Sequence, residues 1–117
     1  MAVEPERSLR ADCLGIVETE GLVPAIEAAD RMLKSGDVNL LCFWRAGEGR
    51  VAVIVQGDTG PVQAAVKAGA DAAARVGKVH GKNVVPRCRR EVVDLLLKSA
   101  CPHRSDETVT VKEPKTQ

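Results

Sequence analysis

The sequence predicts an α+β domain with the ferredoxin-like element order β-α-β-β-α-β and an additional C-terminal helix. Two observations predict this class. Short β-rich runs alternate with two long segments whose apolar residues recur at helical spacing. Two consecutive β-rich runs are joined by a short loop that contains two glycines, which is typical of a hairpin. In this order both helices pack on one face of an antiparallel sheet.

The composition indicates an oligomer. The 117 residues fit one compact domain with a short arm at each end. Apolar residues make up 44% of the chain, but they include one Phe, one Trp and no Tyr beside fifteen Ala and seventeen Val. Because small side chains bury little area each, such a chain gains stability by burying more surface against other subunits.

The first half of the chain predicts a strand, a helix and a second strand. A strand is expected over 11–19, where apolar side chains alternate between two faces. A helix starts near Leu22, because Pro24 fits only its first turn, and Gly36 ends it. A second strand follows over 38–46. The expected buried stripe of the helix is Leu22, Ile26, Ala29 and Leu33.

The second half begins with a third strand over 50–56, which completes the hairpin. Asp58 or Thr59 then caps a long helix that ends near Gly77. Gly69 lies in the middle of this helix, where glycine costs about 1 kcal/mol relative to alanine. It therefore indicates that another backbone lies close by. The apolar stripe consists of Val62, Ala65, Val66, Gly69, Ala72, Ala73 and Val76.

A short strand is expected over 80–85, just before a proline, and a last amphipathic helix over 91–97. The flanking segments are polar and mixed in charge. We therefore expect a flexible N-terminal arm over 1–10, the folded domain over 11–102 and a disordered polar tail over 103–117.

The charge and hydropathy of the chain exclude several classes of protein. Seventeen basic and sixteen acidic residues give a net charge of +1, without the basic excess of a nucleic-acid binder. Two aromatic residues also provide no stacking platform for single strands. No apolar run is long enough to span a membrane, and the N-terminus lacks a secretory signal. A cytoplasmic location is expected.

No catalytic, cofactor or metal site is expected. Neither His80 nor His103 has an evident partner for nucleophilic chemistry. The DTGP segment at 58–61 lacks the pattern of a phosphate-binding loop. Four cysteines are too widely spaced for a metal motif, and we expect them to be reduced packing residues. They are Cys13, Cys42, Cys88 and Cys101.

Three segments in the same order resemble the bacterial microcompartment (BMC) shell domain. Its signatures are matched by 14–30 (LGIVETEGLVPAIEAAD), by 56–77 and by 84–87 (VVPR), and the resemblance spans about 13–97. It implies a non-catalytic, single-domain shell protein that forms flat homohexamers. Such hexamers tile with other shell proteins into facets of a microcompartment shell around encapsulated enzymes.

The resemblance also implies two groups of site residues. Lys34 and Arg87 match positions at the edge between neighbouring hexamers. The loop between strands two and three lines a central pore for small polar metabolites. Glu48 in this loop departs from the family, where the position is most often small or neutral. The pore-lining residues are Arg45, Ala46, Gly47, Glu48, Gly49 and Arg50.

Two questions stay open at this level. Glu48 is either a solvated carboxylate at the hairpin tip or one member of a six-carboxylate ring that disfavours anions. Arg45 or Arg50 could neutralise such a ring by pairing with it. Trp44 is either a core residue or part of an exposed face. The alternative function is a ferredoxin-like oligomeric regulatory or small-molecule-binding module with its ligand between subunits.

Overall fold

The computed structural model describes residues 12–100, and the side chains of 13–99. The expected arms over 1–10 and 103–117, with Cys101 and His103, lie outside the described residues. The described chain has the predicted order of elements: β1 (Asp12–Glu20), α2 (Leu22–Ser35), β2 (Val38–Gly47), β3 (Arg50–Gly57), α3 (Thr59–Val76), β4 (Val79–Cys88) and α4 (Arg90–Ala100).

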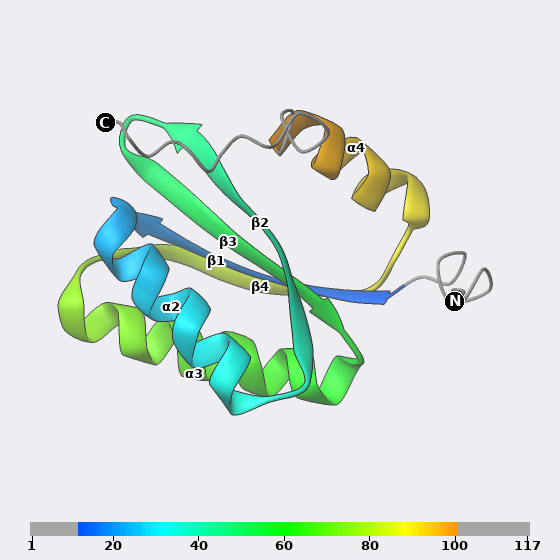
Figure 1. Cartoon of the computed structure of the whole chain (residues 1–117), viewed down its shortest axis with the longest axis horizontal. Helices are drawn as coiled ribbons and strands as arrows, with labels where there is room; N and C mark the ends of the chain where they lie inside the picture. Colours follow the sequence, from blue (N-terminus) through cyan, green and yellow to red (C-terminus); the bar gives the residue numbers. More distant parts are fainter. Residues whose placement is uncertain (1–11, 101–117) are drawn as a thin grey trace, which may run out of the picture.

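The four strands form one antiparallel sheet in the order β2-β3-β1-β4. This order confirms the ferredoxin-like prediction, because β1 lies between β3 and β4 and the hairpin strand β2 lies at one edge. Helices α2 and α3 lie side by side on one face of the sheet, as expected, and α4 lies on the other face (Figure 1). The molecule therefore has three layers.

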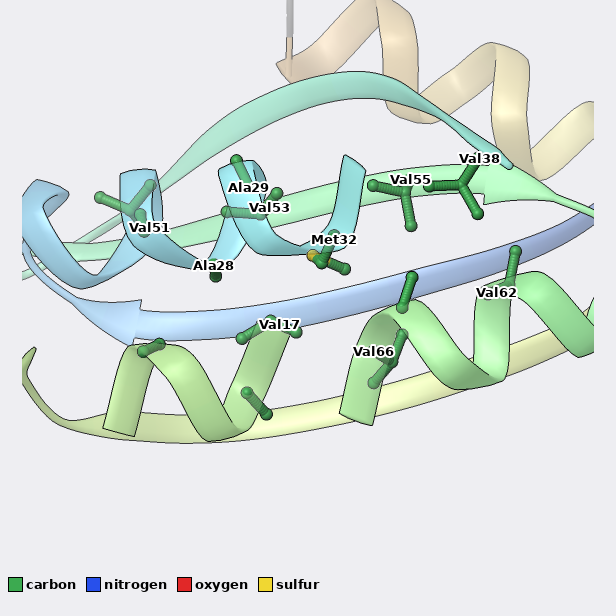
Figure 2. Packing of buried hydrophobic residues seen from close by; sticks show 14 of the residues in the cluster. Val17, Ala28, Ala29, Met32, Val38, Val51, Val53, Val55, Val62 and Val66 are labelled. Atoms are coloured by element: carbon green, nitrogen blue, oxygen red, sulfur yellow. The ribbon is translucent and has the colours of Figure 1, made fainter. Parts of the chain in front are cut away.

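Each face of the sheet carries its own core. Val17 and Val53 face α2 and α3, whereas Leu14 and Ile54 face α4. Figure 2 shows the first of these cores, in which valines and alanines surround Met32. Met32 is the largest fully buried side chain of the described residues. The small-residue composition thus builds two thin layers of packed side chains.

The expected buried stripe of α2 is wrong. Leu22, Ile26 and Leu33 are 53%, 49% and 44% exposed, and only Ala29 of that stripe is buried. The helix turns its small residues inward because α3 approaches it too closely for leucine or isoleucine. The buried residues of α2 are Pro24, Ala25, Ala28, Ala29 and Met32.

The close approach of α3 is set by Gly69, as the sequence predicts. A Cβ added at Gly69 would overlap the Met32 side chain and would lie 3.1 Å from the carbonyl oxygen of Ala28. The rest of the predicted α3 stripe is buried as well, except Val76, which is 51% exposed at the last turn.

Two local predictions are corrected. The last strand is longer than expected, because β4 continues through Pro86 to Cys88. An edge strand tolerates proline, which donates no hydrogen bond to the ladder. Asp58 is the N-cap residue of α3, but its side chain makes no capping hydrogen bond. Its backbone carbonyl accepts instead from the Val62 amide at 2.9 Å.

Candidate pore loop and assembly edge

The hairpin between β2 and β3 ends in a two-residue turn. Gly47 pairs with Arg50, so that Glu48 and Gly49 occupy the two central positions. Their φ angles are 57° and 81°. Positive φ at both central residues is the type I′ geometry, whose twist suits a hairpin. Glu48 takes the left-handed conformation without being a glycine, which is uncommon.

The charges of the loop are not paired with one another. Glu48, Arg45 and Arg50 are all exposed. Within the described part of the chain, the Glu48 carboxylate makes no ion pair with either arginine. In the single chain, neutralisation of Glu48 by its neighbours is therefore absent. The tip presents a carboxylate with one guanidinium on each strand behind it.

The turn of the hairpin is hydrogen-bonded to the residue after β1, and the end of β1 is hydrogen-bonded to the residue before β4. The Gly21 amide donates to the Gly49 carbonyl at 2.6 Å, and the Glu20 amide donates to the Lys78 carbonyl at 2.9 Å. His80 Nε2 lies 2.7 Å from Glu20 Oε1. This contact could not be predicted from the sequence, because Glu20 and His80 are 60 positions apart and only the strand register brings them together.

The expected edge residues occupy exposed positions on two elements. Lys34 lies in the last turn of α2, and its Nζ is 2.9 Å from Asp30 Oδ2. Arg87 lies near the end of β4 with a φ of 52°. The register between β1 and β4 shifts at this point. The resulting irregularity exposes the arginine side chain at the end of the sheet.

The loop and the edge residues lie at opposite ends of the sheet (Figure 1). At one end Gly47 pairs with Arg50, and Arg50 pairs with Glu20. At the other end Cys88 pairs with the first residue of β1, and β2 begins at Val38 shortly after Lys34. At about 3.3 Å per residue, the length of β2 separates the two ends by roughly 30 Å.

Large apolar side chains are exposed on several elements. Four of them lie on α2, where they form the outward stripe that the inward-turned alanines leave behind. A surface of this kind is typical of protein interfaces. The exposed residues are Leu22, Val23, Ile26, Leu33, Leu40, Trp44, Val76, Val92 and Leu95.

No group of three or more His, Cys, Asp or Glu side chains among residues 13–99 could hold a metal ion. Cys13, Cys42 and Cys88 are buried. Burial, with a smaller contribution from Cys13, raises the pKa of the Cys88 thiol. None of the described helices is long and apolar enough to span a membrane.

The family model of the BMC domain matches residues 13–88. The chain belongs to the BMC-domain family. The matched segment contains the hairpin, Lys34 and Arg87, whereas α4 lies beyond it. The family assignment and the ferredoxin-like fold predicted from the sequence are both confirmed.

Relatives of this BMC domain are named as shell proteins. The chain is 49% identical over 90 residues to the microcompartment shell protein PduA of Citrobacter freundii, covering 77% of this chain and 97% of PduA. It is 49% identical over 94 residues to the carboxysome shell protein CsoS1C of Hydrogenovibrio crunogenus, covering 79% of this chain and 92% of the relative. Neither name denotes an enzyme.

A solved structure has the same fold as this BMC domain. It is a microcompartment protein from Desulfitobacterium hafniense, with a TM-score of 0.64 and 34% sequence identity. The match covers 70% of this chain but 44% of that longer chain.

Proposed function

We propose that the chain is a structural shell protein of a bacterial microcompartment and that it forms cyclic homohexamers which tile into facets. The BMC-domain match and the names of the relatives support this role. The chain then acts in the shell within the cytoplasm, beside other shell proteins and around encapsulated enzymes. It contributes a barrier and a pore rather than catalysis.

The observation that carries the proposal is the separation of the hairpin tip from Lys34 and Arg87. In a flat ring of six copies, one end of each sheet lies near the six-fold axis and the other near the rim. A sheet roughly 30 Å long therefore suits a subunit that lines a pore with one end and meets neighbouring hexamers with the other.

The exposed apolar stripe supports the ring as well. Leu22, Ile26 and Leu33 are about half exposed in the single chain. Contacts between subunits would remove this apolar surface from water, at roughly 25 cal/mol for each Å². This gain compensates for a core in which most of the buried side chains of the described residues are valine and alanine.

At the pore, six copies of Glu48 would form a carboxylate ring. Two such charges about 8 Å apart repel each other by roughly 0.5 kcal/mol in water and by more in a confined pore. The ring would disfavour anions and favour cations or neutral polar metabolites. Arg45 and Arg50 would lie behind the ring, because Arg45 precedes the turn on β2 and Arg50 follows it on β3.

At the rim, Lys34 and Arg87 would contact the neighbouring hexamer. The exposed Lys34–Asp30 pair spans one helical turn, and such pairs contribute little to folding. Arg87 has a left-handed backbone conformation that folding alone does not favour. Both residues are therefore better suited to contacts between hexamers than to the stability of one chain.

Sedimentation equilibrium tests the ring directly. The proposal predicts a single species of six times the 12.5 kDa chain mass, about 75 kDa. A dimer, or an oligomer whose size changes with a small ligand, would instead favour the regulatory module. The comparisons do not favour that alternative, because the relatives are named as shell proteins.

A further inference from the structure

A cleft of about 340 Å³ lies between α4 and the sheet, on the face away from α2 and α3. Leu14, Ile16 and Ile54 line it from the sheet, and Val92 and Leu96 line it from α4. Its size falls in the range of small-molecule sites, which are mainly apolar with a few polar groups that orient the ligand.

Three residues that lie side by side across the sheet determine which kind of ligand this cleft can bind. Ala52 of β3 pairs with Glu18 of β1 on one side and with Trp44 of β2 on the other. All three residues line the cleft. Paired residues of antiparallel strands point to the same face, and two strand spacings separate Trp44 from Glu18 by about 10 Å. The small Ala52 side chain leaves the space between them unfilled.

Glu18 is the charged residue of this otherwise apolar lining. It is half-buried, and within the described chain its carboxylate makes no ion pair. A carboxylate among apolar side chains gains from a cationic partner more than an exposed one does. The indole of Trp44, which is 39% exposed, offers a π face that also attracts a cation.

We propose that this cleft binds a small alkylammonium ion. The ammonium group lies over Ala52, between the Glu18 carboxylate and the Trp44 ring, and the alkyl chain lies along Leu14, Ile16 and Ile54. The backbones of Glu18 and Trp44 lie about 10 Å apart, and their side chains rise from the same face of the sheet, so that the two can approach one ammonium group from its two sides. The cleft shares Ala46 with the pore-loop segment but lies against α4, and the proposed binding does not depend on the shell role.

Trp44 reports on this site without any label, because it is the single tryptophan of the chain. The full-length protein is titrated with hexylammonium, 1-hexanol and hexanoate while tryptophan fluorescence is recorded. We expect hexylammonium to bind about tenfold more tightly than hexanol, as a charge-assisted contact would give. Hexanoate should bind more weakly than either. Equal affinities for the three probes, or no saturable change, would overturn the proposal.

Variants distinguish the contribution of the Glu18 charge to binding from that of the apolar lining. Glu18→Gln should lower the hexylammonium affinity about tenfold, to the level of hexanol, and should leave hexanol binding unchanged. Ala52→Leu should weaken the binding of both hexylammonium and hexanol, because the leucine side chain fills the space between Glu18 and Trp44. Glu27→Gln, which changes a carboxylate of α2 on the other side of the sheet, is the matched control and should change nothing. If Glu18→Gln still bound hexylammonium more tightly than hexanol, the assignment would be contradicted. The sedimentation of each variant is measured as a control, and an unchanged result shows that its assembly is intact.

Discussion

Gly69 of α3 packs against Ala28 of α2, with the Ala28 carbonyl oxygen 3.1 Å from the place that a Cβ of residue 69 would occupy. This contact sets the distance between the two helices. It also decides which face of α2 is buried, because only small residues and the flexible Met32 fit beneath α3. The large apolar residues of α2 are left for subunit contacts.

Gly69→Ala should therefore destabilise the chain although alanine favours helix formation. The added methyl group must displace Met32 or the Ala28 carbonyl, and overpacking of this kind costs about 1–3 kcal/mol. Gly60→Ala is the control, because a Cβ at Gly60 meets nothing within 4 Å. Urea denaturation measures both variants. Equal stabilities for Gly69→Ala and Gly60→Ala would contradict the packing described here.

Gly49→Ala should weaken the hairpin tip. Gly49 has a φ of 81°, in the left-handed region that side chains with a Cβ rarely adopt. The strain should cost about 1–2 kcal/mol, although no atom lies near the added methyl group. The free energy of unfolding from urea titrations gives the test. A variant as stable as the wild type would mean that the turn relaxes to another geometry.

Glu48→Gln should change the charge selectivity of the pore. Removal of six carboxylates should raise the entry of small carboxylates into assembled shells several-fold, with no change for the matching neutral amides. Stopped-flow uptake with an encapsulated reporter measures the ratio, and Glu91→Gln on α4 serves as the control. An unchanged ratio would support the solvated-tip interpretation. An effect that persists at high salt, where exposed charges are screened, would contradict selectivity by charge.

Lys34→Ala should leave hexamers intact and abolish sheets. The helical pair with Asp30 is exposed, so its loss should cost the single chain less than about 1 kcal/mol. Lys67 makes the same one-turn contact with Asp71 on α3, which makes Lys67→Ala a matched control. Sedimentation follows the hexamer, and electron microscopy follows the sheets. Sheets of Lys34→Ala, or the loss of its hexamers, would count against the edge role.

Cys88 should make stability fall at alkaline pH. Burial raises the pKa of its thiol above the usual 9.0, so the folded state favours the neutral form. The contribution of Cys88 to stability is fully present below the pKa that the thiol has in the unfolded chain. It is lost as the pH rises toward the higher pKa of the thiol in the folded chain. Urea titrations at about pH 8 and pH 10 should show a larger loss in the wild type than in Cys88→Ala. The same loss in both proteins would refute this effect.

The sequence predicted the order of the elements, the hairpin and the close approach at Gly69, because each depends on local periodicity or on a glycine. It did not predict which side of α2 is buried. Helix α2 has two sets of apolar residues at helical spacing, one of large side chains and one of small side chains. The small set is buried because α3 packs closely against it. The extension of β4 through Pro86 was missed because edge position is a property of the assembled sheet.

Contacts that the register creates were also beyond sequence reasoning. Glu18, Ala52 and Trp44 come from three strands and form a row only once the ladders are aligned. The pairing of His80 with Glu20 has the same origin. Lys34 and Glu48, in contrast, were found through the family resemblance, and the structure adds that they lie at opposite ends of the sheet.

Electron crystallography of two-dimensional sheets formed by the purified protein tests the central claim most directly. The account predicts a hexagonal layer in which the Gly47–Gly49 turns of six chains surround the six-fold axis and Lys34 and Arg87 lie at the contacts between hexamers. A ring with the hairpin tips at its rim, or a protein that never assembles beyond a small oligomer, would contradict it.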